Sequence, residues 1–519
     1  MHTRLNWYAR AAGLILLILG LGSSLSLRPP AGVAAQPPRT IQPALTATTR
    51  PTATPKATPT ATPRVNPAPS SAVYLPITTR NSPWKSPFGV QAELVPLTIG
   101  PVLSRTAELG AGWARMGPIS WRYMQPVENG PINWSMLAGL EAELRDVKRY
   151  GIAPEIVVFN SPSWATINKP FVTSCGAIRA EKFAAFAAFM RELIVRYSGP
   201  EFDVHNWELG NEIDVDPRLV PPNNGFGCWG NANDPFYGGR AYGEMLKAVA
   251  PVMRAADPNV KIWLGGLLLD LPNTTEPGKG RPELFLQGVL EAGGAPYFDI
   301  LPYHAYMPYL NRVVDPDLPI GAPWTPLGGR VRGKAAFLRA IMAKYGVDKP
   351  LFLNETALMC PDNNLPFKAY CSPPADSFYQ TQAIYVVRAF ARALAINVQG
   401  IIWYTINGPG WFNTGLLGAN NLPTPAYQAF AIFSDQLKTA EYIGPVNYGK
   451  GVEAYAFGRF DRRVQVVWAI DDQTLAINIP QAQFVSAIDR SGNPITPIAN
   501  GSDYLLLARF EPMYITLTR

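Results

Sequence analysis

Eight short apolar segments alternate with helical segments through most of the chain, and this alternation constrains the fold more than any other feature. In the helical segments the apolar residues recur with helical spacing, as Phe186, Met190 and Leu193 do within 180–197. Alternating strands and helices predict parallel strands with right-handed crossovers. Eight such units predict an α/β fold, a (β/α)₈ TIM barrel with enlarged loops. The predicted strands cover 87–92, 112–117, 152–159, 203–209, 260–266, 298–304, 350–355 and 399–405.

An open, doubly wound sheet is the alternative arrangement of the same elements. Sheets of that kind commonly bind nucleotides through a G-x-G-x-x-G or G-x-x-x-x-G-K-[ST] motif that opens a helix. Neither motif opens a helical segment in this sequence. The sequence therefore favours the barrel and excludes the usual nucleotide-binding sheets.

The residues that precede the barrel predict export. Arg4 and Arg10 come before an apolar run at 11–21, and the small residues at 33–35 form a cleavage site. We expect cleavage there and a secreted or cell-surface protein. An uncleaved membrane anchor is the alternative, although the run is shorter than the ~20 apolar residues that span a bilayer.

We expect the chain to have four parts. A signal peptide at 1–35 precedes a Pro/Thr-rich linker at 36–80, whose composition is typical of an extended segment without a core. The barrel is expected at 81–436, and a small C-terminal all-β sandwich domain at 437–519. This last part contains short strands separated by turn residues, at 452–460, 463–470, 474–479, 484–489, 504–508 and 513–517.

The charge and the histidine content exclude several classes of function. The formal net charge is +7 without a block of Lys and Arg, so we expect no nucleic-acid partner. The histidines are His2, His205 and His304, which leaves no HExxH zinc motif and argues against a His-rich metal centre. We expect no metal and no other cofactor. We interpret His205, early in its strand, as a structural residue.

Four cysteines indicate disulfides in an exported protein. Three ways of pairing Cys175, Cys228, Cys360 and Cys371 are possible. The pairings Cys175–Cys228 and Cys360–Cys371 would each join nearby loops. The sequence contains no C-x-x-C motif, so a redox or zinc role is disfavoured.

Two carboxylates follow predicted strands on opposite sides of the barrel. Glu212 comes after the fourth strand and Glu355 ends the seventh, and functional side chains of such barrels lie at these strand ends. Glycoside hydrolysis requires one protonated and one ionised carboxyl group. Arg115 and His304 could keep Glu355 ionised, and its charge would favour the protonated form of Glu212.

Other polar and aromatic residues lie at the same strand ends. Asn211 could bind a ring hydroxyl beside the scissile bond, and Trp403 could form an apolar floor for the sugar ring. Asn160 and Trp164 follow the third strand. Tryptophans in predicted loops are candidates for stacking on sugars, namely Trp164, Trp229, Trp324 and Trp411.

Together these residues resemble the clan A retaining glycoside hydrolases. The resemblance implies that Glu212 is the acid/base, that Glu355 is the nucleophile and that Tyr306 is hydrogen-bonded to the nucleophile. The β-sandwich after the barrel is similar to the arrangement in family 39 and related families. The residues that carry the resemblance are Arg115, the Asn211-Glu212 pair, the His304-x-Tyr306 motif, Glu355 and Trp403.

The resemblance implies a secreted retaining glycosidase that cleaves β-linked glycosides in an oligosaccharide or polysaccharide. A non-catalytic carbohydrate-binding barrel at the cell envelope is the alternative function. The presence of both carboxylates with their supporting residues favours the enzyme. We expect contact with a membrane only if the N-terminal segment stays uncleaved.

Overall fold

The computed structural model describes residues 86–92, 97, 100–167, 176–216, 227–269, 281–318, 324–362 and 367–519. The predicted signal peptide, the predicted linker and Cys175 lie outside these residues. Among the residues that are described, no helix has the length and apolar character needed to cross a membrane.

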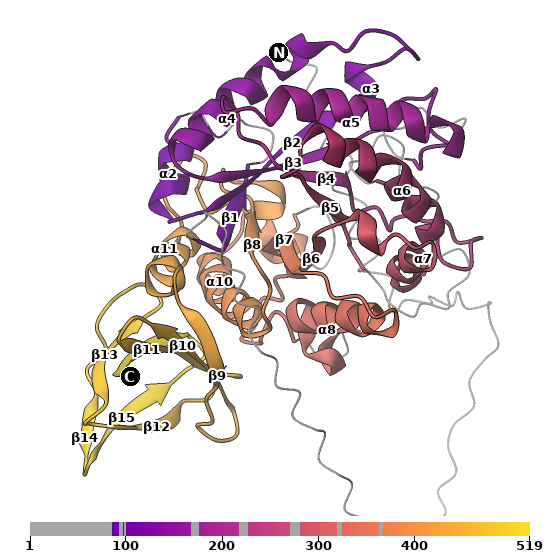
Figure 1. Cartoon of the computed structure of the whole chain (residues 1–519). Coiled ribbons are helices and arrows are strands. Elements are labelled where there is room, and N and C mark those ends of the chain that lie inside the picture. The colour runs from indigo at the N-terminus through magenta and orange to yellow at the C-terminus, as the bar shows by residue number, and fades with distance from the viewer. Residues whose placement is uncertain are drawn as a thin grey trace, which may run out of the picture. The chain divides into compact units, whose positions relative to one another are not determined.

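Eight parallel strands form a nearly closed barrel with helices around it (Figure 1). The strands are β1 (Phe88–Gln91), β2 (Trp113–Ser120), β3 (Ala153–Phe159), β4 (Asn206–Asn211), β5 (Lys261–Gly266), β6 (Leu301–Pro308), β7 (Leu351–Met359) and β8 (Ile401–Tyr404). They pair in the order β5-β4-β3-β2-β1-β8-β7-β6. Isolated parallel bridges, Trp263 to Ile300 and Leu267 to Tyr303, join the two ends of the sheet. The predicted (β/α)₈ barrel is therefore confirmed.

The barrel strands are buried on both faces, which explains their nearly continuous apolar composition. All 9 residues of β7 are buried, and β3 has one partly exposed residue, Phe159 at its end. Some residues of these strands are polar. Four of them, from four different strands, meet inside the barrel: Arg115, Glu155, Glu208 and Asn354.

Helices with one buried apolar face cover the outside of the barrel. In α5 (Phe183–Tyr197) the side chains of Phe186, Met190 and Leu193 are buried, as their spacing predicts. The other α-helices are α2 (Val102–Glu108), α3 (Trp121–Met124), α4 (Ala138–Arg149), α6 (Gly239–Ala256), α7 (Phe285–Glu291), α8 (Gly329–Lys344), α9 (Lys368–Cys371), α10 (Asp376–Ala395) and α11 (Pro425–Leu437). Short 3₁₀ helices lie at η1 (Trp134–Leu137), η2 (Ala180–Lys182), η4 (Pro282–Leu284), η5 (Ala295–Tyr297), η6 (Thr325–Leu327) and η7 (Trp411–Asn413).

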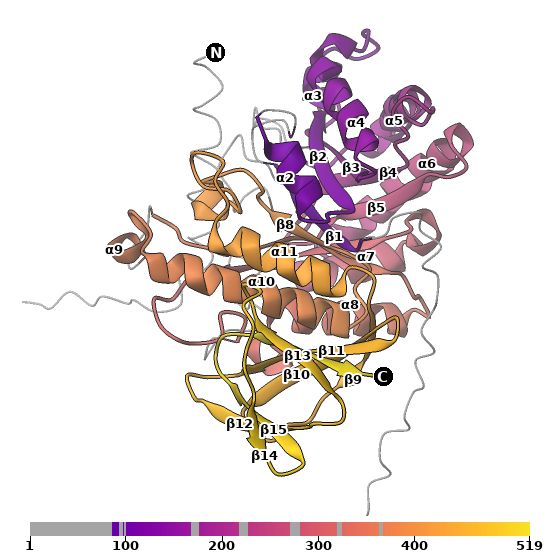
Figure 2. The ribbon, with the colours of Figure 1, turned by 90° about the vertical axis from the view of Figure 1, so that its left-hand side faces the viewer.

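Beyond α11 the chain forms two antiparallel sheets, drawn in yellow in Figure 2. Their strands are β9 (Glu441–Pro445), β10 (Val452–Arg459), β11 (Arg462–Ala469), β12 (Leu475–Pro480), β13 (Phe484–Asp489), β14 (Ile498–Asn500), β15 (Asp503–Ala508) and β16 (Met513–Thr518). One sheet has the order β13-β16-β11-β10-β9 and the other β12-β15-β14. Val467 and Ile515 of the first sheet share a core with Ile477 and Leu506 of the second. The predicted C-terminal β fold is confirmed.

Buried ion pairs connect α10 with the loop after β6 and with β10. Arg392 donates two hydrogen bonds to Glu453, of 3.0 and 2.6 Å, and two to Asp315, of 3.1 and 2.5 Å. Arg388 donates to Asp315 and to the carbonyl oxygen of Ala469, over 3.0 Å each. Because both guanidinium groups are fully buried, these contacts anchor the five-stranded sheet on the outer helices of the barrel.

Candidate active site

Glu212 and Glu355 come together at the mouth of the barrel. Glu212 is the first residue after β4, and Glu355 lies within β7. The two residues are buried, with 4% and 6% of their surface exposed. One oxygen of each carboxyl group and a ring nitrogen of His304 lie within 4.8 Å of one another. Residues from opposite sides of the barrel therefore share one site.

The backbone takes an uncommon conformation where β3 and β4 end. Asn160 has a φ of 62° and Glu212 a φ of 49°, in the left-handed region that non-glycine residues rarely occupy. Such conformations cost about 1–3 kcal/mol and persist where the surroundings hold them, often at functional sites. The same conformation occurs elsewhere in the chain, for example at Asp203 and Asn397, so here it agrees with the site that the side chains define.

Glu355 accepts hydrogen bonds on both oxygens. The guanidinium of Arg115, on β2, donates to Oε1, and the hydroxyl of Tyr306, on β6, donates to Oε2. Burial and the charge of Glu355 raise the pKa of Tyr306 well above its usual value, so this hydroxyl keeps its proton and donates. The two donors compensate the negative charge of a buried carboxylate. The hydrogen bond from Tyr306 agrees with the one that the resemblance implied.

His304 lies between the two carboxyl groups. Its Nδ1 is 2.9 Å from Oε1 of Glu212 and 3.3 Å from Oε2 of Glu355. Burial lowers the pKa of His304 to about 4, and the charge of Arg115 acts in the same direction, although Glu355 opposes it. The imidazole is therefore neutral at neutral pH. It supports the carboxyl groups as a hydrogen-bond donor through Nδ1 rather than as a cation.

Arg115 connects the site to the interior of the barrel. Its Nε donates to Glu208 over 2.8 Å, and its other nitrogens donate to Gln91 and Asn211 over 2.7 Å each. Burial disfavours the ionised form of Glu208, but the guanidinium outweighs it and lowers the pKa of Glu208. Burial and the charge of Glu208 raise the pKa of the neighbouring Glu155 well above its usual value. One buried cation therefore serves the ionised Glu208 and also Glu355, and Glu155 is neutral.

The structure places Trp403 away from the site, which corrects the prediction that its ring forms the floor for a sugar. Trp403 is fully buried, its Nε1 donates to the carbonyl oxygen of Thr414 over 2.9 Å, and its ring packs 6.2 Å from that of Tyr385 on α10. Neighbouring residues of a strand point to opposite faces. The next residue, Tyr404, accordingly has its ring 6.1 Å from that of Tyr306.

Trp411 completes an aromatic group around the nucleophile candidate. Its ring lies 5.3 Å from that of Tyr306 and 6.1 Å from that of Tyr404. Of the other predicted stacking residues, Trp229 and Trp324 are buried at 6% and 2% exposure and belong to the core. Trp411, in the loop after β8, and Tyr404, at the end of β8, are partly buried and lie beside Tyr306.

Asn160 and Trp164 lie on the side of the mouth formed after β3. Oδ1 of Asn160 is buried and has no hydrogen-bond partner within the described part of the chain. This residue lines a cavity of about 30 Å³ together with Trp121 and Gly210. Trp164 is partly buried, donates from Nε1 to the carbonyl oxygen of Gln125 over 3.2 Å, and packs 5.0 Å from Trp121. Within the described part of the chain, neither Asn160 nor Trp164 is hydrogen-bonded to Glu212 or Glu355.

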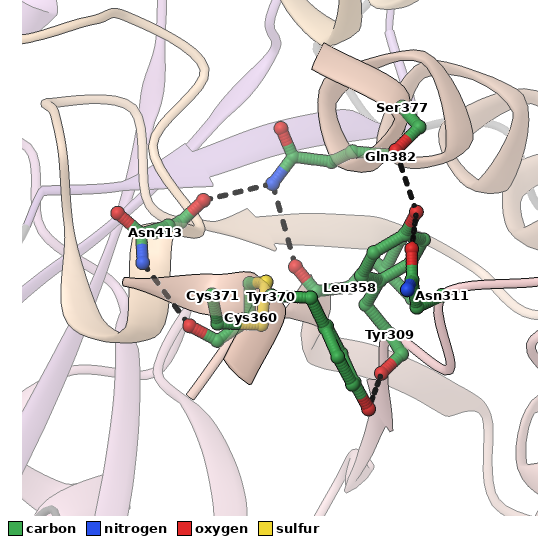
Figure 3. The surroundings of a disulfide bond; sticks show 9 residues. All are labelled: Tyr309, Asn311, Leu358, Cys360, Tyr370, Cys371, Ser377, Gln382 and Asn413. Carbon is green, nitrogen blue, oxygen red and sulfur yellow. Dashed lines mark hydrogen bonds between the residues drawn. A yellow bond between two sulfur atoms is a disulfide. The ribbon is translucent and has the colours of Figure 1, made fainter. Parts of the chain in front are cut away.

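A disulfide joins Cys360, directly after β7, to Cys371 at the end of α9 (Figure 3). The Cα atoms are 5.2 Å apart, within the range of about 4.4–6.8 Å that a disulfide requires. This predicted pairing is confirmed. Cys228 is also disulfide-bonded, and Cys175, with which it was predicted to pair, lies outside the described residues.

The same segment is hydrogen-bonded to the loop that carries Trp411. The backbone N–H of Cys360 donates to the carbonyl oxygen of Phe412 over 2.8 Å. The side-chain amide of Asn413 donates to the carbonyl oxygen of Cys360 over 3.1 Å. Nε2 of Gln382, on α10, donates to the carbonyl oxygens of both Leu358 and Asn413, as Figure 3 shows. The disulfide therefore borders a hydrogen-bonded junction between the loops after β7 and β8.

Glu212, His304 and Glu355 also have the spacing of a metal-binding group, because their ligand atoms lie within 4.8 Å of one another. Both oxygens of Glu355 are already hydrogen-bonded, to Arg115 and to Tyr306. A cation at this place would share its carboxylate with a guanidinium of the same charge. The donor set therefore fits acid/base chemistry better than metal binding.

No protein-family model and no curated protein matches the chain. Solved structures do match. A family 39 glycoside hydrolase from Bacteroides cellulosilyticus WH2 has a TM-score of 0.62 at 19% identity, over 84% of this chain and 81% of that one. A GH30 endoxylanase from Clostridium papyrosolvens C71 has a TM-score of 0.57 at 12% identity, over 84% and 97%. A monomeric beta-xylosidase from Caulobacter crescentus CB15 has a TM-score of 0.51 at 16% identity, over 83% and 96%. At these identities the matches establish a shared fold.

Proposed function

We propose that this chain, which shares its fold with family 39 and family 30 glycoside hydrolases, is a retaining glycosidase that cleaves β-linked glycosides. The observation that carries the proposal is the buried pair Glu212 and Glu355, in which one oxygen of each carboxyl group lies within 4.8 Å of the other. Retaining enzymes hold their carboxyl groups about 5–5.5 Å apart, whereas inverting enzymes leave about 6.5–9.5 Å for a water molecule. The short separation supports a double displacement.

In the first step Glu355 is the nucleophile and Glu212 the general acid. The carboxylate of Glu355 attacks the anomeric carbon while Glu212 gives its proton to the leaving glycosidic oxygen. A glycosyl ester forms and the bond to the leaving group breaks. In the second step Glu212 takes a proton from a water molecule, whose oxygen attacks the anomeric carbon and releases Glu355. Two inversions give net retention.

The neighbouring residues hold the two carboxyl groups in place. Arg115 and Tyr306 fix the attacking oxygens of Glu355 and compensate the charge that returns when the ester is hydrolysed. The neutral imidazole of His304 donates to Glu212 and can do so in both protonation states of that carboxyl group. These contacts preorganise the reacting groups before a substrate binds.

We assign sugar binding to the polar and aromatic residues around the pair. Asn211, whose Oδ1 accepts from Arg115, is assigned to a ring hydroxyl beside the scissile bond. The buried Oδ1 of Asn160 offers an acceptor for another hydroxyl. Tyr404 and Trp411 supply an apolar wall for the less polar face of the ring.

The expected partner is an oligosaccharide or polysaccharide outside the cell. The Cys360–Cys371 disulfide agrees with an oxidising compartment, as the export signal at 1–35 predicts. We propose that the linker at 36–80 separates this signal from the barrel at 81–436, and that the β-sandwich occupies 437–519.

The proposal is tested by measuring turnover of aryl β-glycosides and β-linked polysaccharides with the purified protein. We expect turnover of at least one substrate and its loss in Glu355→Gln. Glu244→Gln is the control, since that carboxylate is 53% exposed on α6 and should be dispensable. Carbohydrate binding without turnover would support the non-catalytic alternative and overturn the proposal.

A further inference from the structure

Strand β6 carries His304 and Tyr306 and lies at the place where the barrel closes. It pairs with β7 along its whole length, whereas toward β5 the described residues show two isolated bridges, from Trp263 to Ile300 just before β6 and from Leu267 just after β5 to Tyr303. The N–H of His304 points toward that side, because it donates to Leu267 over 2.9 Å. In a strand the N–H and C=O of one residue point to the same edge, so the carbonyl groups of residues 304 and 306 also face the β5 side.

Two cations of α8 satisfy these two carbonyl groups. Nζ of Lys334 donates to the carbonyl oxygen of His304 over 2.9 Å and also to that of Leu268, just beyond β5. Nη1 of Arg330 donates to the carbonyl oxygen of Tyr306 over 2.6 Å. Lys334 is only 1% exposed. A buried ammonium group is costly, so its hydrogen bonds to backbone oxygens are required rather than optional.

The spacing of the two cations matches the spacing of the two carbonyl groups. Residues four apart lie on one face of a helix, about 6 Å along its axis. Alternate residues of a strand are about 6.6 Å apart and point to the same side. Arg330 pairs with residue 306 and Lys334 with residue 304, so α8 runs antiparallel to β6, as a right-handed crossover requires.

The first turn of α8 is itself fixed. The carboxylate of Asp317, in the loop after β6, accepts from the N–H groups of Arg330 and Val331 over 2.7 and 3.3 Å. A carboxylate at a helix N-terminus satisfies free N–H groups and interacts favourably with the helix dipole. The cap therefore sets the register of α8 against the strand.

We propose that Arg330 and Lys334 are positioning residues of the active site. They fix the backbone of β6, so that Tyr306 stays on Glu355 and the imidazole of His304 stays on Glu212. This inference rests on the proposed function and adds two residues that act through the backbone of β6.

The kinetic test uses Arg330→Met and Lys334→Met, with Lys344→Met as the matched control at the exposed end of the same helix. We expect kcat to fall about tenfold or more in both variants with little change in KM, because small displacements of reacting groups cost up to about 100-fold. The control should keep the kcat of the original protein. Lys334→Arg retains a cation and a donor and should recover part of the loss. Equal kcat in all variants would overturn the proposal.

A second measurement needs no substrate. The titration of His304 is followed by NMR in protein labelled at histidine, with His205 as an internal reference, since the chain has 3 histidines. Loss of the cation in Lys334→Met should raise the pKa of His304 and leave that of His205 unchanged. The charged and titratable groups that act on His304 are Arg115, Glu208, Glu212, Lys334 and Glu355.

The two measurements separate the two proposals. An inactive original protein in which Arg330→Met, whose guanidinium contacts the backbone of Tyr306, still shifts the His304 resonances would overturn the glycosidase proposal but support the positioning of β6. An active protein in which Lys334→Met and Arg330→Met keep the original kcat would overturn the positioning role alone. Thermal unfolding of each variant shows whether it folds. If Lys334→Met, which removes a buried side chain, does not fold, Arg330→Met still tests the proposal because Arg330 is partly exposed.

Discussion

Nδ1 of His304 lies 2.9 Å from Oε1 of Glu212, and burial lowers the pKa of this histidine to about 4. The contact is therefore a hydrogen bond from a neutral ring and not an ion pair at neutral pH. The negative charge at the site is compensated by Arg115 and by the hydroxyl of Tyr306, both on Glu355. Glu355 is thus paired with a cation and a hydroxyl group, and Glu212 with a neutral imidazole. Two carboxyl groups with different roles, a nucleophile and an acid/base, require such different surroundings.

The lowered pKa of His304 predicts a loss of stability in acid. An unfolded histidine titrates near about 6.5, and folded His304 near about 4, so between these values the unfolded chain binds more protons. Stability therefore falls as the pH drops from about 6.5 toward about 4. In His304→Gln we expect the melting temperature to fall less steeply over this range than in the original protein, as followed by circular dichroism.

Two other buried groups titrate in the same pH range, and their effect on stability has the opposite sign to that of His304. Burial raises the pKa of Glu143 to about 7 and that of Asp214 to about 6, so each favours the folded state as the pH falls. Both groups are present in the variant and in the original protein. The difference between the two curves therefore isolates His304, and parallel curves would contradict the assignment.

Glu212→Ala should affect substrates according to their leaving groups. A positioned general acid contributes about 10²–10⁴-fold, so we expect a loss of that order for alkyl glycosides and a much smaller loss for aryl glycosides with acidic phenols. The basic limb of the pH–rate profile should flatten in this variant. A variant that retains the full bell-shaped profile would remove Glu212 from the acid/base role.

The sequence was sufficient to predict the barrel because the same local pattern, an apolar strand followed by a helix, repeats along the chain. Each of the eight predicted strands overlaps an observed one. In the C-terminal sheets β9 and β14 were not predicted, because β9 is largely exposed and β14 has 3 residues, all exposed. Such edge strands lack the alternation of buried and exposed residues on which the prediction depended.

The candidate site was predicted where the strand ends alone determine it, as for Glu212 and Glu355. The prediction failed at Trp403, because a shift of one residue along a strand moves a side chain to the opposite face, and Tyr404 takes that place instead. The contacts of Lys334 could not be predicted at all. They depend on the packing of α8 against the barrel, which local sequence patterns do not specify.

Removal of the Cys360–Cys371 disulfide should affect substrate binding more than the barrel. In the double variant Cys360→Ser/Cys371→Ser we expect KM to rise, because the segment holds the loop that carries Trp411. The free energy of unfolding should fall by at most about 2–4 kcal/mol, the range typical of disulfides. The double variant is preferable to a reductant, which would also act on Cys228. An unchanged KM with a large loss of stability would contradict this prediction.

Glu355→Gly should lose nearly all turnover and respond to small anions. Without the nucleophile, azide or formate can enter the vacated space and attack the anomeric carbon of an activated aryl glycoside. The product should then have the inverted configuration, because only one displacement has occurred. Rescue is measured as released phenol against azide concentration. Glu244→Gln, which leaves the site intact, should show no response to the anion.

The stereochemistry of the unmodified protein decides between the two hydrolytic mechanisms. One oxygen of the Glu212 carboxyl group lies within 4.8 Å of one oxygen of Glu355, whereas an inverting enzyme holds its carboxyl groups about 6.5–9.5 Å apart to leave room for a water molecule. We therefore expect the first product to have the β configuration of the substrate, with the other anomer appearing later by mutarotation. Proton NMR of the anomeric signal during the first minutes of hydrolysis gives the answer directly. An initial α product would show that water attacks in a single step, and Glu355 would then be a general base and not the nucleophile.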